Sequence, residues 1–590
     1  MVTLFGAFEV GARGLLAQQQ GLNVTGHNIA NANTEGFSRQ RVNLATSYPL
    51  NVTPGSVGTG VRVESIQRLR DEFLDFQLRE ATTENGFLDA NSDIFLELQT
   101  ILQDPLNPLA DTLENSPAES GLNGLLSRFF GAFQELAANP ESIAVRATVR
   151  ETAISLAEGI STVRGNLSDL RETLNNRIRD TVSEVNSLLE RIGTLNEDIA
   201  RIEAVSGNSA NDLRDLRDQA LTQLSELVPI TVTPQANGSV DVRVLGTGAV
   251  IGNRVSPFEA LIAPGDSSGD YQIVNSLERS RVLTNDLEGG RLGALIHARD
   301  DLVPDFINQI DTLAATVIRE VNRAHSGSIG LEGFTSLTGS QDVANPATVF
   351  DSLGLPFPPQ AGSFTLRVVN SEGVVQNLYS INFNPAVDSL ADLAARIDAI
   401  DGVAGPGGGS ISASVTTDNR LSITSNGGLE FTFQGDTSGA LASLGLNTFF
   451  SGSDGSDIAV SDFILDPTEG LRRIAASATG APGDNGGALT LAGLQNALVA
   501  GSGSTTIGDF YRQTIAELGV RAQRNASRID ASERTLNGLR DQVESVSGVS
   551  LDEEAVNLIR FQQAFNAAAR YITTVDSLID RVVNGMGVTR

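Results

Sequence analysis

Residues 550–585 read SLDEEAVNLIRFQQAFNAAARYITTVDSLIDRVVNG, and the spacing of apolar residues in this stretch decides the fold. Ser550 stands at an expected helix N-cap and Glu553 three residues later, where each side chain can satisfy the other's backbone amide. Apolar residues then recur every seven positions: the a positions are Leu551, Leu558, Phe565, Ile572, Ile579 and Met586, and the d positions are Phe561, Ala568, Val575 and Val582. Such a stripe over about four heptads is typical of a coiled-coil helix. The stretch predicts a long association helix that Gly585 and Gly587 end.

The N-terminal segment carries a weaker form of the same pattern. Four apolar residues lie seven apart in a mostly uncharged stretch: Phe8, Leu15, Leu22 and Ile29. The segment also contains Gly11, Gly14, Gly21 and Gly26, and glycine lowers helix stability by up to roughly 1 kcal/mol relative to alanine. We expect this helix to persist by burying its stripe against the C-terminal helix and neighbouring subunits. The alternative is that the two helices simply close one core within a single molecule.

Three inner segments predict further helices of a long bundle. Heptad seams run through residues 174–202 and 515–546, and a shorter helix is expected over residues 304–321. The C-terminal stripe does not continue the register of the 515–546 seam, because one residue is added near Gly548. We interpret that shift as a break between two helices.

Between residues 339 and 468 the helical period gives way to alternation. Strands are expected at SFTLRVV (363–369) and in a hairpin at ISASVTT and LSITS (411–425), with one helix at 389–400. Residues 230–280 form a second strand-rich patch.

The prediction is a multidomain, mainly α protein: a long helical bundle and terminal coiled-coil helices made from both chain ends, with inserted β-rich or α+β domains. The expected division is 1–45 (N-terminal axial helix), 46–229 (long helical bundle), 230–288 (small strand-rich subdomain), 289–338 (bundle, continued), 339–468 (inserted surface domain), 469–549 (bundle, C-terminal part) and 550–590 (C-terminal axial helix).

Composition excludes several classes of function. The chain has 590 residues, enough for two to four domains, and its 71 acidic against 41 basic residues leave a net charge of −30. That charge argues against nucleic acid or an anionic membrane as partners. Cysteine is absent, so disulfides and thiolate chemistry are excluded. The sequence shows neither a signal-peptide pattern nor a run of about 18 apolar residues for a membrane span.

The sequence offers no candidate for catalysis, a cofactor or a metal. The three histidines, His27, His297 and His325, lie far apart and outside any metal-ligand motif. Glycine-rich nucleotide motifs are missing, and GDSSG (265–269) follows a proline instead of a strand, so we interpret it as chance. The aspartates of DGSD (454–457) lack a complete calcium-loop spacing and are interpreted as solvated surface groups.

Two stretches carry a family resemblance. GLNVTGHNIANANTEGFSRQRV (21–42) closely resembles the N-terminal signature of flagellar rod, hook and hook-associated proteins, and VNLIRFQQAFNAAARYITTVDSLIDRVVN (556–584) resembles their C-terminal signature. Asn28, Asn31 and Asn33 stand where the N-terminal stripe ends, where short amides can bond exposed backbone, and Gly36 permits a bend. Segments 211–232, 289–314 and 321–333 and the SRQ after Phe37 resemble the hook-associated subgroup at the hook–filament junction.

The resemblance implies an extracellular structural protein of the bacterial flagellum, exported by the flagellar type III apparatus without a cleaved signal peptide. It implies a ring of about eleven copies, with the hook protein and the next junction protein as partners and a cytoplasmic export chaperone on the C-terminal helix. Neither a cofactor nor catalysis is implied. The expected assembly interface consists of Leu15, Leu22, Ile29, Asn28, Asn31, Asn33, Gly36, Leu551, Leu558, Phe561, Phe565, Ile572, Val575, Ile579 and Val582.

Two alternatives stay open at this point. The chain could be another axial component, such as a hook or rod protein, which shares the same terminal signatures. The inserted domain could instead be an adhesin or a wall-degrading enzyme on an axial scaffold, although paired acids at a defined spacing are not seen there.

Overall fold

The computed structural model describes residues 4–52, 55–103, 121–265, 268–400 and 409–585. The chain divides into two compact units, which we describe separately. The first comprises Met1–Asp93, Thr173–Arg299 and Gln523–Arg590, and the second comprises Ile94–Glu172 and Asp300–Ala522. Long helices and several small sheets make up the chain, which confirms the predicted mainly α class with inserted strand-rich parts. The finer seven-part division stays a prediction.

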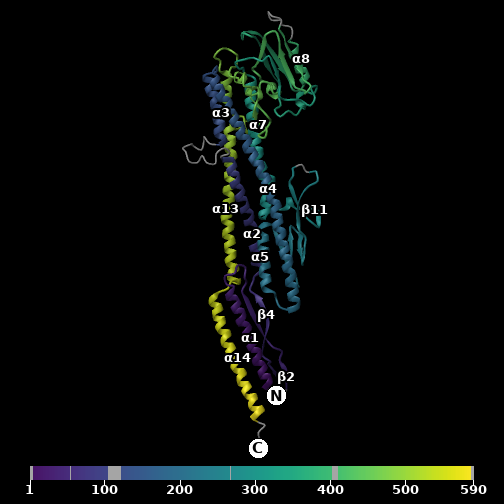
Figure 1. Cartoon of the computed structure of the whole chain (residues 1–590), viewed down its shortest axis with the longest axis vertical. Coiled ribbons are helices and arrows are strands. Elements are labelled where there is room, and N and C mark those ends of the chain that lie inside the picture. Colours follow the sequence, from purple (N-terminus) through teal and green to yellow (C-terminus); the bar gives the residue numbers. More distant parts are fainter. Residues whose placement is uncertain (1–3, 53–54, 104–120, 266–267, 401–408, 586–590) are drawn as a thin grey trace. The chain divides into compact units, whose positions relative to one another are not determined.

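The two ends of the chain form one helix pair in the first unit. Helix α1 (Leu4–Ala30) and helix α14 (Leu551–Gly585) lie side by side (Figure 1). Helix α13 (Ile507–Ser547) ends just before α14, so the predicted break near Gly548 is confirmed. Only half of the predicted capping box forms: the Glu553 amide donates to Ser550 Oγ at 3.4 Å, whereas the Glu553 carboxylate accepts from Arg39 at 2.6 Å.

Strands follow α1, in a part of the chain that the sequence analysis assigned to helices. β1 (Gln40–Thr46) pairs antiparallel with β4 (Val61–Arg68), and β2 (Leu50–Val52) pairs with β3 (Gly55–Val57). The prediction of helical structure from residue 46 onward is therefore wrong for residues 46–52 and 55–68. The β1–β4 ribbon is short and half exposed, so its alternation of polar and apolar residues is too weak a signal against the neighbouring helical periods.

A helical core with two small sheets completes the first unit. Its helices are parts of α2 (Glu72–Gln103) and α4 (Ile143–Ser206), with α5 (Asn211–Leu227) and α6 (Gly290–His297). The seam predicted over residues 174–202 lies on α4, where the buried large apolar residues are Leu174, Ile178, Val182, Val185, Leu189, Ile192, Leu195 and Ile199. One sheet contains β5 (Ile230–Pro234), β6 (Val240–Val244), β7 (Thr247–Ile251) and β8 (Arg254–Val255), and the other contains β9 (Phe258–Ile262), β10 (Tyr271–Asn275) and β11 (Glu278–Val282).

Three asparagines of α4 hold the strand-rich part against the helix. Asn196 donates to the Val240 carbonyl at 2.8 Å and accepts from the Val240 amide at 3.1 Å. Asn186 makes the same two-way contact with the Phe258 backbone, at 2.8 Å each way. Asn175 accepts from the Tyr271 amide at 2.9 Å. These bonds satisfy backbone groups of the sheets that would otherwise be buried without partners.

The second unit has an aromatic core between helices. Helix α3 (Gly121–Ala138) packs against α12 (Gly486–Gly493), which also contacts α7 (Val303–Ser326), so the helix predicted from residue 304 is confirmed. Phe129 lies 5.5 Å from Phe450 and 5.9 Å from Phe449, measured between ring centroids. Such edge and tilted contacts are the favoured geometry of buried aromatic rings.

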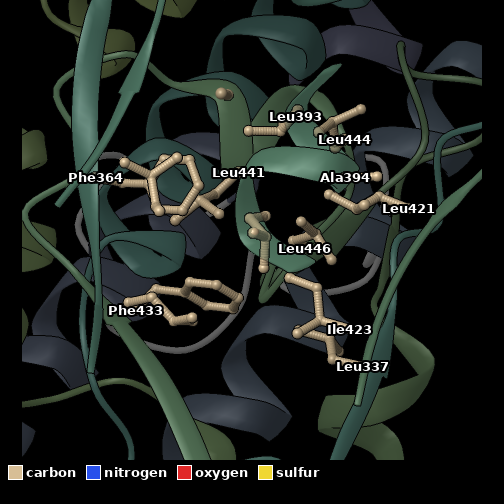
Figure 2. Close-up of a cluster of buried hydrophobic side chains, with 14 of the residues drawn as sticks. Leu337, Phe364, Leu393, Ala394, Leu421, Ile423, Phe433, Leu441, Leu444 and Leu446 are labelled. Atoms are coloured by element: carbon tan, nitrogen blue, oxygen red, sulfur yellow. The ribbon is translucent and has the colours of Figure 1, made fainter. Parts of the chain in front are cut away.

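Residues 336–434 of the second unit form two three-stranded sheets around one apolar core. The orders are β14–β13–β17 and β12–β16–β15. The strands and helix of this part are β12 (Ser336–Thr338), β13 (Gly362–Asn370), β14 (Val375–Phe383), α8 (Leu390–Asp398), β15 (Ile411–Val415), β16 (Leu421–Ser425) and β17 (Leu429–Gln434). Five short elements follow it along the chain: α9 (Ala440–Ser443), β18 (Phe450–Ser451), β19 (Ala459–Val460), α10 (Asp462–Leu465) and α11 (Gly470–Arg473). Figure 2 shows Phe364 and Phe433 on one side of this core and Leu337, Leu421 and Ile423 on the other. The predicted strand, helix and hairpin of this region are confirmed.

His325 is fully buried at the end of α7 and is held as a neutral ring. Nδ1 lies 2.8 Å from the Asn447 carbonyl, and Nε2 accepts from the Ala475 amide at 2.9 Å. An amide donor at Nε2 requires that this nitrogen be unprotonated, so the proton sits on Nδ1. Burial lowers the pKa of His325 to about 4. The positive charge of Arg146 also lowers this pKa, whereas the hydrogen bond to Asn447 raises it.

Acid is expected to destabilise the second unit through this one residue. Between pH 6.5 and pH 4 the unfolded chain binds a proton at His325 that the folded chain does not, so stability falls as the pH falls. The expected loss is about 3 kcal/mol in the free energy of unfolding. Urea unfolding at several pH values should show this slope in the natural chain and lack it in His325→Gln. Equal slopes in the two proteins would contradict the prediction.

Candidate assembly surface on the paired terminal helices

Glycines let α1 and α14 approach closely. A Cβ added at Gly21 would lie 2.6 Å from the Phe561 ring, and one at Gly11 would lie 2.8 Å from Ile572 Cγ1. Because Gly21 faces Phe561 while Gly11 faces Ile572, the two helices run antiparallel. The large side chains of α14 therefore occupy space that only glycine leaves open on α1.

The packed face of α1 lies beside the predicted apolar stripe. Its buried residues are Gly11, Ala17, Gly21, Val24, Thr25 and Asn28. Leu15 and Leu22 are half-buried and Ile29 is 37% exposed, so they flank the contact. Helix propensity alone predicts only that these glycines weaken the helix. The available signal was the spacing of three and then seven residues between Gly11, Gly14 and Gly21, which places three glycines on one face of the helix.

Adding a single methyl group to this face should loosen the pair. Gly21→Ala is expected to lower the stability of the α1–α14 contact by about 1–3 kcal/mol, because the new Cβ overlaps the Phe561 ring. Gly26→Ala is the matched control, since its added Cβ meets nothing within 4 Å and should instead stabilise α1 by up to about 1 kcal/mol. Hydrogen exchange of the α14 amides measures both effects. Equal protection in the two variants would contradict the packing role of Gly21.

The heptad seam of α14 is only partly covered. Val575 is 4% exposed, but Leu551 is 55% and Val582 is 42% exposed. The other predicted seam residues that the structure describes are half-buried: Leu558, Phe561, Phe565, Ala568, Ile572 and Ile579. Met586 lies outside the described residues. Contact with α1 thus covers one side of the stripe and leaves apolar area open.

Further apolar side chains that the sequence analysis missed project from the same pair. On α14, Val556 is 66%, Ile559 is 53% and Val583 is 64% exposed. On α1, Phe5 is 72% and Leu16 is 62% exposed. We call these five residues the outer apolar surface. Exposed apolar side chains are candidates for contacts with other subunits. These five lie outside the a and d positions, which is why the heptad pattern did not reveal them.

The asparagine-rich segment after α1 has a structural role within the chain. Asn28, which is 1% exposed, donates to the Gln40 carbonyl at 2.9 Å and accepts from the Gln40 amide at 3.0 Å. Asn31 donates to the His27 carbonyl at 3.0 Å, which helps to close the helix end. Gly36 has a φ of +79°, as the predicted bend requires. Asn33 and Gly36 are both exposed to solvent.

The strand ribbon is anchored to α5 through buried charges. The Ser38 amide donates to Asp215 at 3.0 Å and the Ser38 hydroxyl donates to Asp215 at 2.7 Å. Arg68, at the end of β4, pairs with Asp215 at 2.6 Å and with Asp218 at 2.9 Å. These bonds place the segment after α1 against the helical core of the first unit.

Arg39 ties this segment to the start of α14. Its guanidinium pairs with Glu554 at 2.7 Å and with Glu553 at 2.6 Å, and its amide donates to the Ser547 carbonyl at 2.8 Å. Glu554 occupies a d position of the seam and its side chain is 2% exposed. Burial alone would lower the pKa of Arg39, but the hydrogen bonds and charges of the two glutamates outweigh it and raise that pKa. The turn between α13 and α14 is thus fixed by an arginine from the other end of the chain.

The remaining sequence candidates show no chemical site. In DGSD, Asp457 accepts from the Ser453 and Asp454 amides at 2.7 and 2.9 Å, so its carboxylate stabilises its own loop. GDSSG lies partly outside the described residues. Within the described ranges, no group of three metal-ligating side chains gathers. Among the helices described, none is both long enough and apolar enough to cross a bilayer.

Comparison with known families places the chain among flagellar proteins. Residues 107–340 match the model of the flagellar hook-associated protein FlgK helical domain. Residues 8–37 match that of the flagella basal body rod protein, and residues 541–585 match that of the flagellar basal body rod FlgEFG protein C-terminal region.

Whole-length relatives agree with these matches. Flagellar hook-associated protein 1 of Bacillus subtilis (strain 168) is 30% identical, over 100% of this chain and 99% of that protein. Flagellar hook-associated protein 1 of Escherichia coli (strain K12) is 25% identical, over 97% of this chain and 98% of that protein. The solved flagellar hook junction protein FlgK from Burkholderia pseudomallei is 17% identical, with a TM-score of 0.48, and covers 80% of this chain and 100% of its own.

Proposed function

Because the chain belongs to the family of flagellar hook-associated protein 1, we propose that its terminal helix pair builds the hook–filament junction by packing its outer apolar surface against neighbouring subunits. The chain is a structural component of the bacterial flagellum at that junction. The observation that carries the proposal is the exposure of this surface, in which Val556 is 66%, Ile559 is 53% and Leu16 is 62% exposed. The α14 seam beside it also leaves Leu551 and Val582 open.

Burial of this surface favours assembly. Each large apolar side chain that is removed from water contributes about 1.5–3 kcal/mol. Polymerisation lets Val556, Ile559 and Leu16 contact other copies, whereas in the single chain they face solvent. The alternative in which the two helices only close a core within one molecule leaves this exposed area unexplained.

The partners follow from the position of the protein in the flagellum. Assembly joins it to other flagellar axial proteins, and we propose a ring of about eleven copies that contacts the hook protein on one side and the next junction protein on the other. The exposed α14 residues are also the proposed binding site of a cytoplasmic export chaperone, because an unshielded apolar helix aggregates. The proposed route is flagellar type III export to the cell exterior without a cleaved signal.

The two alternative functions receive no comparable support. The rod-family matches cover only residues 8–37 and 541–585, the ends shared across axial proteins, whereas the hook-associated relatives span the whole chain. For residues 339–468, no described feature supplies a catalytic pair or a ligand-binding constellation that would favour an adhesin or an enzyme.

Charges placed on the outer apolar surface should block attachment. The double variant Val556→Asp with Ile559→Asp is expected to weaken binding to isolated hooks by about 100-fold or more, because assembly would bury two unpaired carboxylates. Electron microscopy of hooks mixed with purified protein measures the attachment, and adding protein from outside bypasses export.

The matched control adds the same charge to the same helix. Gln563→Asp with Asn566→Asp changes two exposed polar residues of α14 and should attach as the natural chain does. Hydrogen exchange of the free monomers should be equal in both variants. Normal attachment of the Val556→Asp, Ile559→Asp protein would refute the proposed interface.

A further inference from the structure

Five arginines line one cavity of the first unit. The cavity has a volume of about 460 Å³ and lies among the end of β4, the start of α2, α5 and the β5–β6 strands. The arginines that line it are Arg68, Arg70, Arg79, Arg214 and Arg217. In a chain with a net charge of −30, such a gathering of positive side chains requires an explanation.

Three of these arginines are neutralised by carboxylates. Arg68 pairs with Asp215 at 2.6 Å. Arg70 pairs with Asp75 at 2.7 Å, and it shares Asp218 with Arg68. Arg214 pairs with Glu203 at 2.7 Å. These carboxylates give Arg68, Arg70 and Arg214 the opposite charges that buried ions need. They do not account for the other two arginines of the cavity.

The other two arginines lack such partners. In the described part of the chain, neither Arg79 nor Arg217 forms an ion pair, and only more distant charges act on them. Arg217 is 3% exposed and donates to two neutral oxygens, Asn196 Oδ1 at 3.1 Å and the Gly238 carbonyl at 2.7 Å. Its Nε–H has no acceptor. Burial lowers the pKa of Arg79, and it lowers the pKa of Arg217 to about 10.

We propose that this cavity binds a small oxyanion of the phosphate or sulfate class between Arg79 and Arg217. A tetrahedral oxyanion offers several acceptors to guanidinium donors and supplies the missing negative charge. Three carboxylates line the same cavity, but Asp75 and Asp218 are engaged by Arg68 and Arg70, and Glu72 is exposed to water at the rim. The bound anion would bridge α2 and α5 in the first unit.

Binding of inorganic phosphate to the full-length chain tests this proposal. Calorimetric titration at constant ionic strength should show one saturable site for phosphate and none for chloride, and phosphate should raise the unfolding temperature. Arg79→Met should weaken phosphate binding by about tenfold or more, because it removes a charged donor. Arg243→Met, which changes an exposed arginine of β6 outside the cavity, should bind as the natural chain does.

The choice of variant keeps the outcome interpretable. Arg217→Met also removes hydrogen bonds to Asn196 and Gly238, so it disturbs the fold itself. The Arg79 side chain donates no hydrogen bond within the described residues, and Arg79→Met should keep the circular dichroism spectrum of the natural chain. Equal responses to phosphate and chloride, or unchanged phosphate affinity in Arg79→Met, would overturn the proposal.

Discussion

A chain shortened to end at Ser550 is expected to lose attachment to hooks entirely. The truncation removes α14, which is the partner of the glycine face of α1 and carries most of the outer apolar surface. Without Phe561 and Ile572 opposite Gly21 and Gly11, α1 loses its largest packed face and keeps only its contacts with β1 and β4. Its glycines then disfavour the helix. Purified truncated protein mixed with isolated hooks should leave every hook tip bare in electron micrographs.

The truncation should spare the rest of the molecule. The buried seam of α4 and the aromatic core around Phe129 and Phe449 are built without α14, so their cooperative unfolding should survive. Full-length protein treated in the same way serves as the positive control. If the shortened chain still covers hook tips, the terminal pair is not the assembly element.

Removing the arginine side chain at position 39 is expected to release the start of α14. Arg39→Ala leaves the Glu554 carboxylate, 2% exposed, without its partner, and breaking a buried ion pair from one side costs about 3–5 kcal/mol. Protection of the first α14 amides against hydrogen exchange should fall by about two orders of magnitude or more. The loss should extend to attachment, because the start of α14, which carries the exposed Val556 and Ile559, would no longer be fixed.

A second substitution separates charge from shape. Combining Arg39→Ala with Glu554→Leu removes the stranded carboxylate and should recover much of the lost protection, since an apolar residue suits a d position of the seam. Arg570→Ala, at an exposed arginine of α14, is the matched control and should leave protection unchanged. Equal protection in Arg39→Ala and Arg570→Ala would show that the ion pair does not hold the helix.

The helices were predictable because their signals are local. The apolar period of residues 551–582, the cap at Ser550 and the register shift near Gly548 all lie within a few turns of the structure they specify. The Ser389 cap with Asp392 and the hairpin around Asn419 are local in the same sense. Such patterns reflect backbone geometry and the need to bury one face, and neither depends on distant residues.

The details of the terminal pair depend on contacts between residues that are hundreds of positions apart. Arg39 and Glu554 are separated by 515 residues, and Gly21 acquires its packing role only when the Phe561 ring lies against it. The β1–β4 ribbon has only a weak local alternation, and its anchors at Asp215 and Asp218 belong to the distant helix α5.

Residue spacing and motifs were enough to predict that both chain ends form long helices with an apolar stripe, that helical parts alternate with strand-rich parts, and that the family is flagellar. The folded chain was needed to show which face of α1 is packed, which seam residues stay open, and which arginines lack a carboxylate partner. Helical period depends on neighbours along the chain, whereas burial and charge pairing depend on neighbours in space. Helical period can therefore be read directly from a sequence, whereas burial and charge pairing become visible only in the folded chain.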